Sequence, residues 1–203
     1  MSPATARINP LLTASNLVSD SEHSPDVYET ARATIEACQR GDESAQRRLY
    51  DGTHQHVYRL MFRMVGPQDA SDVTQQAFLQ VFRKIGQFAG RAQLETWIYR
   101  VAINEALQHI RRSKRARLRT LEQEPMDRSP SNYENVGDKE LLEEALNGLD
   151  PDLRSAFLLR EVEGLSYREI AEALRIPEGT VGSRLNRARG DLRKRLIELG
   201  WEQ

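Results

Sequence analysis

The sequence predicts an all-α protein built from two small helical domains that a flexible linker joins. Aromatic residues make up only 6% of the 203-residue chain, which favours helices over a strand-rich core. Apolar residues recur at intervals of three and four in several stretches, which is the spacing of one helix face. This periodicity fails between about 118 and 137, where proline, serine and acidic residues gather. We therefore expect a first domain over 28–117, a linker over 118–137 and a second domain over 138–203.

Composition and the N-terminal residues restrict the class of protein. The 29 basic and 30 acidic residues nearly cancel, so their positions matter more than the net charge of -1. Cys38 is the one cysteine and cannot form a disulfide within the chain, which indicates a reducing compartment, the cytoplasm. Residues 1–27 lack the apolar run of a signal peptide or membrane span. We expect a disordered extension there and no insertion into a membrane.

Glycine and aspartate residues delimit the helices expected in the first domain. A short helix over 30–40 is followed by Gly41, which is positioned to end it. Asp42 then begins a long amphipathic helix that Gly66 and the proline after it stop. A further helix over 69–85 carries two apolar stripes, of which one should pack inside the domain and the other should await a partner. The inner stripe is Ala70, Val73, Ala77 and Val81, and the outer one is Leu79 and Phe82 beside Asp72, Gln75 and Arg83.

The last helix of the first domain leads into a run of basic residues. Residues 86–92 form a loop with two glycines, after which helical periodicity restarts. Residues 111–119 contain no acidic residue, and such a like-charged run is typical of segments that bind a polyanion. Upstream lie Phe88, Trp97 and Tyr99, and aromatic plus basic groups suit unstacked bases. Trp97 falls on the apolar face, however, which favours a place in the core over base stacking.

The strongest local signal is a helix-turn-helix over 166–196. Ser166 and Glu169 form a capping-box pattern, and a turn at 176–179 separates the two helices. The second helix, from about Thr180, has an apolar inside and a polar outside, as a DNA-reading helix requires. Asparagine and arginine can bind purine edges in the major groove, while flanking arginines suit phosphates. The inside is Val181, Leu185, Ala188, Leu192 and Leu196, and the outside is Ser183, Asn186 and Arg187, flanked by Arg184 and Arg189.

No residue pattern supports an enzyme or a metal centre. His54 and His56 lie two residues apart on a helix, so their rings should diverge, and no acidic or cysteine ligand pattern accompanies them. The sequence has no glycine-rich phosphate loop and no nucleophile elbow. We therefore expect no catalysis, no cofactor and no metal.

Taken together, these features resemble the extracytoplasmic-function sigma factors, over nearly everything from about Ile35 to the C-terminus. Residues 72–78, DVTQQAF, look like the segment with which that family grips the polymerase clamp helices. Residues 96–104, TWIYRVAIN, look like its promoter-melting helix. The end of the chain is the most specific part. Close matches to the family's second domain are LLREVEGLSYREIAE at 158–172 and GTVGSRLNRAR at 179–189.

The resemblance implies a transcription initiation factor that has no catalysis of its own and is a monomer when free. Its first domain would bind core RNA polymerase and capture the opened minus-10 promoter element. Its second, a winged-helix-like four-helix domain, would read the minus-35 element as duplex DNA. An anti-sigma factor, often membrane-bound in this family, would hold it inactive in a stress or envelope response.

The resemblance also implies three sets of binding residues. The core polymerase set is Asp69, Asp72, Gln75, Phe78, Leu79 and Phe82. The minus-10 and melting set is Phe88, Arg91, Arg100, Asn104, Arg111, Arg112 and Arg115. The minus-35 set is Arg168, Thr180, Ser183, Arg184, Asn186, Arg187 and Arg189.

Four residues depart from the family pattern. Gly182 stands where relatives usually place lysine or arginine, which would remove one phosphate or base contact. Arg175 replaces the glycine often found in the turn of the helix-turn-helix. Ala92 and Leu94 differ from the usual serine and phenylalanine of the melting loop. The resemblance therefore does not specify the promoter sequence.

Two other functions would use parts of the same pattern. A conventional repressor or activator would use the helix-turn-helix without touching core polymerase, and would usually dimerise on a palindromic site. The lack of a dedicated dimerisation element and the outer face of the 69–85 helix speak against it. A decoy that only titrates an anti-sigma factor is disfavoured because Asn186, Arg187 and the basic run over 111–119 are present.

Overall fold

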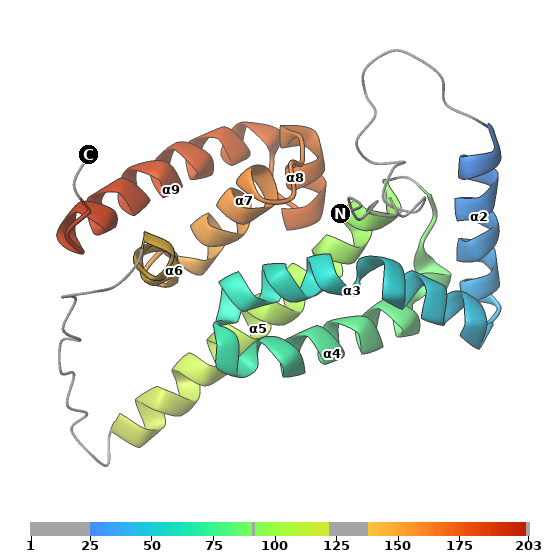
Figure 1. Ribbon diagram of the computed structural model, residues 1–203, viewed down its shortest axis with the longest axis horizontal. Coiled ribbons are helices and arrows are strands. Elements are labelled where there is room, and N and C mark those ends of the chain that lie inside the picture. The colour runs from blue at the N-terminus through green and yellow to red at the C-terminus, as the bar shows by residue number, and fades with distance from the viewer. Residues whose placement is uncertain (1–24, 91, 122–137, 202–203) are drawn as a thin grey trace, which may run out of the picture.

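The computed structural model describes residues 25–90, 92–121 and 138–201. These residues form eight α-helices and one short 3-10 helix, with no strand, which confirms the all-α prediction for this part of the chain (Figure 1). None of the helices in these ranges combines the length and apolar character that crossing a membrane requires.

The first domain packs four α-helices around a buried apolar core. They are α2 (Pro25–Gln39), α3 (Glu43–Val65), α4 (Pro67–Lys84) and α5 (Leu94–Leu121), with the 3-10 turn η1 (Ile85–Gln87) after α4. Asp42 caps α3, because its side chain accepts a hydrogen bond of 2.8 Å from the Ala45 N–H. Gly66 ends α3 at φ 87°, a conformation that favours glycine, so both predicted boundaries are confirmed.

Two boundaries of the first domain differ from those predicted. The first helix begins at Pro25, so residues 25–27 are helical where disorder was expected; proline suits a first helical position because its φ is preset. Helix α5 continues through Leu121, four residues into the expected linker, since no glycine or proline interrupts the chain there. The rest of the predicted extension and linker, residues 1–24 and 122–137, lies outside the described residues.

The second domain has four helices, and its described residues include no strand that could form a wing. The helices are α6 (Asp138–Asn147), α7 (Pro151–Glu161), α8 (Tyr167–Leu174) and α9 (Glu178–Glu198). Helix α7 has an aspartate cap, because the Asp150 side chain accepts hydrogen bonds from the N–H groups of Asp152 and Leu153. Leu158, Leu159, Ile170 and Leu185 are fully buried and form the centre of this domain.

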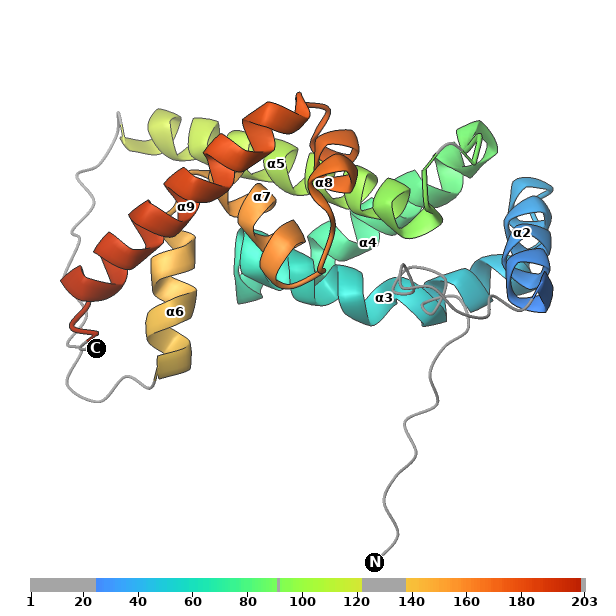
Figure 2. The same ribbon diagram turned by 90° about the horizontal axis from the view of Figure 1, so that it is seen from above.

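The helices of the two domains pack directly against each other. Helix α8 lies on α5, while α6 and α7 contact α3, as the two views show (Figures 1 and 2). The buried apolar side chains of both domains belong to one continuous cluster. The arrangement therefore brings the helix-turn-helix against the helix that carries the predicted melting residues.

Candidate nucleic-acid and polymerase interfaces

Helices α8 and α9 form the predicted helix-turn-helix, and local hydrogen bonds fix its geometry. The Ser166 hydroxyl accepts from the Glu169 N–H at 3.3 Å, and the Glu169 carboxylate accepts from the Ser166 N–H at 2.8 Å. This confirms the capping box. Arg175, at the end of α8, adopts φ 54° and ψ 47°, so it takes the left-handed conformation that the usual glycine would adopt. The second helix begins at Glu178, two residues earlier than expected.

Helix α9 has the apolar inside and polar outside that its periodicity predicts. Val181, Leu185 and Ala188 are each fully buried, whereas Asn186 is exposed. The Arg187 side chain is 75% exposed and lies on the same outer face. The Ser183 hydroxyl donates a hydrogen bond of 2.9 Å to the Thr180 carbonyl, which orients the start of this surface.

Each arginine of the predicted minus-35 set lies near a carboxylate. The Arg189 guanidinium donates a 2.7 Å hydrogen bond to Glu161, and this bond raises the pKa of Arg189. Exposed ion pairs of this kind contribute about 0–1 kcal/mol, so a DNA phosphate or base edge can replace each carboxylate at little cost. The other pairs are Arg168 with Glu172 at 3.5 Å, Arg187 with Asp191 at 3.7 Å and Arg184 with Asp152 at 4.0 Å.

The surface of α9 at Gly182 faces the ring of Tyr167. A Cβ atom at Gly182 would lie 3.6 Å from the Cε2 atom of Tyr167, an ordinary van der Waals contact. The ring of Tyr167 also lies 5.6 Å from the guanidinium carbon of Arg160, in a cation–π contact. The side chain of a lysine or arginine at position 182 would therefore start beside this ring. With glycine at position 182, no side chain lies next to the ring there.

Among the aromatic residues of the melting segment, Trp97 and Tyr99 are buried in the core and Phe88 packs against it. The rings of Phe88 and Trp97 meet edge to face with centroids 5.5 Å apart, and Trp97 is only 6% exposed, which confirms its place in the core. The Tyr99 hydroxyl donates a 2.6 Å hydrogen bond to the Glu163 carboxylate. Burial, and then the charge of Glu163, raise the pKa of Tyr99 far above its usual range. Arg91 lies outside the described residues.

The polar residues of the predicted minus-10 set on α5 divide into a partly buried arginine, Arg100, and an exposed group. Arg100 lines an open cleft of about 340 Å³ with Trp97, Glu172 and Arg175. Burial, and then the charge of Arg175, lower the pKa of Arg100. In Figure 1 the last turns of α5 extend away from the other helices. The exposed group is Asn104, Arg111, Arg112 and Arg115.

The outer stripe of α4 is a polar surface with one large apolar residue. Asp72 and Gln75 are exposed, and Leu79 is 51% exposed. Phe82 is partly buried and packs against the core. Asp69, at the start of α4, accepts a hydrogen bond of 2.9 Å from His109 of α5 while its side chain stays 48% exposed.

Phe78, which was predicted to contact polymerase, does not lie on this outer surface. It is 3% exposed, and its ring meets that of Tyr50 on α3 edge to face, with centroids 4.7 Å apart. Phe78 follows Thr74 by one helical turn, and both side chains are buried against the neighbouring helices. The inner face of α4 is therefore wider than the stripe of Ala70, Val73, Ala77 and Val81 that the sequence indicated.

Comparisons with known proteins identify both domains. The family model Sigma-70 region 2 matches residues 49–116, and Sigma-70, region 4 matches residues 139–192. The ECF RNA polymerase sigma-E factor of Haemophilus influenzae is 33% identical over 79% of this chain and 92% of the relative. The ECF RNA polymerase sigma factor SigE of Mycolicibacterium smegmatis is 37% identical over 86% of this chain and 70% of the relative. The chain belongs to the ECF sigma factors.

Solved structures share the fold of this sigma factor. The sigma factor RpoE of Bartonella quintana, in complex with the anti-sigma factor NepR, has a TM-score of 0.61 and 23% identity over 76% of this chain and 98% of its own. CnrH, in complex with the cytosolic domain of CnrY, has a TM-score of 0.61 and 20% identity over 84% of this chain and 98% of its own. As a member of its family, the sigma factor acts in promoter-specific initiation of transcription by RNA polymerase.

Two buried charged residues of the sigma factor were not predicted from the sequence. Arg154 of α7 is 6% exposed and donates to the carbonyl oxygens of Met64, Asn147 and Leu149. Burial lowers the pKa of Arg154 to about 10, so the side chain remains charged at neutral pH. The side chain of Glu163, in the turn after α7, is 3% exposed. Each of the two also contacts the first domain, Arg154 through Met64 and Glu163 through Tyr99, and no local pattern encodes these contacts.

The two histidines of α3 diverge as their spacing predicts. The His54 ring lies 4.6 Å from the ring of Tyr50 and 6.1 Å from that of Tyr58. The Nδ1 atom of His56 instead lies 3.7 Å from the Glu163 carboxylate. Within the described ranges, no group of three or more histidine, cysteine or acidic residues is placed to hold a metal ion.

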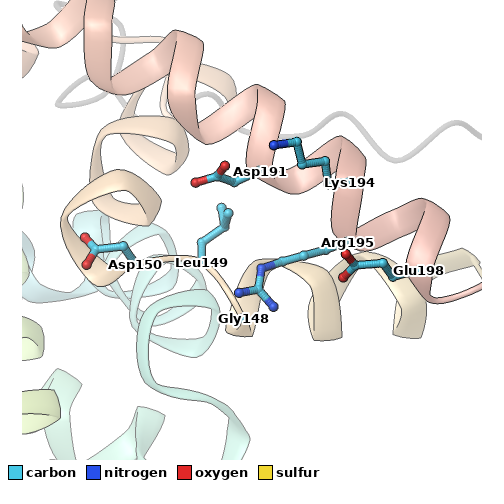
Figure 3. A pocket seen from close by; sticks show the side chains of 7 residues that line it. All are labelled: Gly148, Leu149, Asp150, Asp191, Lys194, Arg195 and Glu198. Atoms are coloured by element: carbon cyan, nitrogen blue, oxygen red, sulfur yellow. The ribbon is translucent and has the colours of Figure 1, made fainter.

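A shallow cavity of about 280 Å³ separates the α6–α7 turn from α9 (Figure 3). The Arg195 side chain reaches from α9 toward Gly148, where a Cβ atom would collide with its guanidinium group. Acidic and basic side chains face one another across this cavity, so its walls favour no one ligand charge. Arg195 is exposed, and its side chain points toward the α6–α7 turn. The lining is Gly148, Leu149, Asp150, Asp191, Lys194, Arg195 and Glu198.

Proposed function

We propose that this ECF sigma factor binds promoter DNA and core polymerase through three separate surfaces. The observation that carries the proposal is the division of α9, whose apolar residues are buried while Asn186 and Arg187 are exposed. Such a helix fits the major groove, where asparagine can read adenine and arginine can read guanine. We assign the minus-35 element to this surface, with Arg168, Arg184 and Arg189 on phosphates.

The minus-10 element is assigned to α5 and the loop before it. Asn104 and the exposed basic residues of α5 form a polar surface that can follow a nucleic-acid backbone. Unpairing a base costs a few kcal/mol, so contacts at the loop around Phe88 must offset that cost. Arg100, which lines the open cleft beside α8, would join this surface.

Core polymerase is assigned to the outer stripe of α4. Leu79 is an exposed apolar side chain flanked by polar groups, an arrangement that suits a protein partner better than DNA. Asp72 and Gln75 would supply the polar contacts around it. The chain is proposed to catalyse no reaction itself and to act in the cytoplasm, where bacterial polymerase works.

An anti-sigma factor is the proposed regulator of this chain. Of the two sigma factors of similar fold, RpoE was solved in complex with the anti-sigma factor NepR, and CnrH in complex with the cytosolic domain of CnrY. Such a protein would compete with polymerase for Leu79 and its neighbours. The free sigma factor is proposed to be a monomer.

Transcription with purified core polymerase on a random promoter pool tests the assignment. Asp72→Arg should abolish specific transcripts because it reverses a charge at the polymerase surface. Arg187→Ala should leave core binding intact and change which promoters are used. The matched controls are Asp51→Arg, an exposed charge reversal on α3, and Arg47→Ala, a loss of an exposed arginine on α3. Duplex binding without any transcript would contradict the proposal and favour a repressor.

The basic end of α5 can be tested by the salt dependence of strand binding. Each phosphate contact to single-stranded DNA contributes about 0.7 to the slope of log affinity against log salt concentration. Replacing Arg111, Arg112 and Arg115 together by alanine should therefore reduce that slope by about 2. An unchanged slope would show that these arginines do not contact the strand.

A further inference from the structure

An exposed aromatic ring lies beside a glycine in the helix-turn-helix. Tyr167 is the first residue of α8, and it is 38% exposed. A Cβ atom at Gly182 of α9 would lie 3.6 Å from the Cε2 atom of this ring. Apart from the backbone of α9 and the two residues next to Gly182, nothing else lies within 4 Å of that position. The glycine therefore leaves a gap on the surface of α9, which we name the Gly182 notch, and the ring of Tyr167 forms one wall of it.

The Gly182 notch lies on the same face of α9 as the proposed base reader. Residues four apart are neighbours on one helix face, so the exposed Asn186 side chain starts one turn beyond Gly182. Arg189 follows on the same face. The hydrogen bond with Glu161 is the first cause that raises the pKa of Arg189, and Tyr167 raises it further. Tyr167 is therefore a neighbour of the outer face of α9 at both Gly182 and Arg189.

Contacts within the second domain hold the ring of Tyr167 in position. The guanidinium carbon of Arg160 lies 5.6 Å from the ring centroid. Arg160 is itself fixed, because it donates a 2.8 Å hydrogen bond to the carbonyl of Leu165, just before α8. The capping box at Ser166 fixes the start of α8. A ring held in this way loses little conformational entropy when it contacts a ligand, so a single apolar contact can be effective.

The Gly182 notch suits a small apolar group. Its wall is the edge of an aromatic ring, and Gly182 contributes no polar side chain. In the major groove, thymine presents its C5-methyl group, and apolar side chains recognise thymine by contact with that methyl. A phosphate oxygen would instead require a hydrogen-bond donor, which the ring edge at Cε2 does not offer.

We propose that Tyr167 is a specificity-determining residue of the minus-35 surface, whose ring contacts the C5-methyl group of one thymine that the Gly182 notch admits. One turn of α9 rises about 5.4 Å and successive bases lie about 3.4 Å apart, so this thymine would lie within about two base pairs of the one that Asn186 reads. The inference rests on the proposed function of α9. It adds base recognition by the first helix of the motif.

Replacement of thymine by deoxyuridine tests the contact, because it removes the C5-methyl group and leaves base pairing unchanged. The probe is a minus-35 duplex from a promoter recovered in the transcription assay, with each thymine replaced in turn. Binding of the full chain is measured for every duplex. At one position, deoxyuridine should weaken binding by about fourfold, the effect of one buried methyl group.

Four variants assign that effect to the Gly182 notch. Tyr167→Ala removes the ring, and Gly182→Ala fills the notch with a methyl group, so each should abolish the difference between thymine and deoxyuridine at that position. Tyr167→Phe keeps the ring and should retain the difference. The matched control is Gly190→Ala, a second glycine of α9 whose added Cβ atom would meet nothing within 4 Å, and it should also retain the difference. Circular dichroism reports whether each variant is folded.

The outcomes separate the thymine contact from the proposed function. A folded Tyr167→Ala variant with the thymine preference of the wild type would overturn the contact, as would a wild type that is insensitive to deoxyuridine at every position. Loss of the preference in Tyr167→Phe would also overturn it, because the hydroxyl and not the ring would then make the contact. If Tyr167→Ala does not fold, Gly182→Ala against Gly190→Ala decides the result. A wild type that binds no minus-35 duplex contradicts the proposed function of α9, and the thymine contact fails with it.

Discussion

Helices α9 and α5 carry similar side chains, but their surroundings differ. On α9 the arginines are exposed or partly exposed and lie near carboxylates of the same domain. On α5, Tyr99 and Arg100 face the other domain, and Tyr99 is bonded to a buried carboxylate of that domain. The proposed minus-35 surface therefore belongs to one domain alone, whereas Arg100 of the proposed minus-10 surface lies in a cleft that both domains line.

The comparison of Arg154 with Arg189 shows how burial changes the role of one residue type. Arg154 is 6% exposed and donates to three backbone carbonyl groups, so its removal leaves buried acceptors without donors. The Arg189 side chain is 47% exposed and donates to one carboxylate that water can also solvate. We expect Arg154 to determine stability and domain packing, and Arg189 to determine affinity for DNA.

The largest effect is expected for Arg154→Ala. Removing a buried charged partner typically costs about 3–5 kcal/mol, because the groups that it satisfied stay buried and unpaired. Urea unfolding of the full chain measures the change in the free energy of unfolding. A loss below about 1 kcal/mol would show that water reaches these carbonyl groups and that the contrast with Arg189 is false.

A smaller effect, confined to DNA, is expected for Asn186→Ala. This side chain is exposed, so its loss should leave the free energy of unfolding unchanged within about 0.5 kcal/mol. Discrimination at one base pair of the minus-35 element should fall by about 1–3 kcal/mol. Competition between duplexes with single base-pair changes measures it. An equal loss on every duplex would mean that Asn186 contacts the backbone.

Ser166→Ala tests α8, the helix that lies on α5 and also supports α9. Loss of the capping hydroxyl should lower the free energy of unfolding by about 1 kcal/mol, because the Glu169 N–H loses its acceptor. Ser183→Ala is the matched control, since that hydroxyl donates to a carbonyl on an exposed helix face. Equal values for the two serines in thermal unfolding would argue that the capping box contributes nothing to α8.

The features that depend on local spacing could be predicted, and those that depend on packing between helices could not. The buried stripe of α9 and the cap at Ser166 follow from helical periodicity and from backbone N–H groups near a helix start. Phe78 lies at the edge between two stripes of α4, and the ring of Tyr50 on α3 decides which way it packs. The contacts of Glu163 with Tyr99 and of Arg154 with Met64 were missed because each partner comes from the other domain, far away in the sequence.

The smallest effect on stability is expected for Arg189→Ala. Its ion pair with Glu161 is exposed, so the free energy of unfolding should fall by about 0.5 kcal/mol or less in urea unfolding. Binding to the minus-35 duplex should weaken similarly for all sequences, and the salt slope should drop by about 0.9, the value for one phosphate contact. Glu161→Ala is the control, because it frees Arg189 without removing it and should leave that slope unchanged. A measured destabilisation by Arg189→Ala as large as that by Arg154→Ala would contradict this expectation. The ion pair with Glu161 would then be a structural contact between α7 and α9, and the exposure of the side chain would not distinguish the roles of the two arginines.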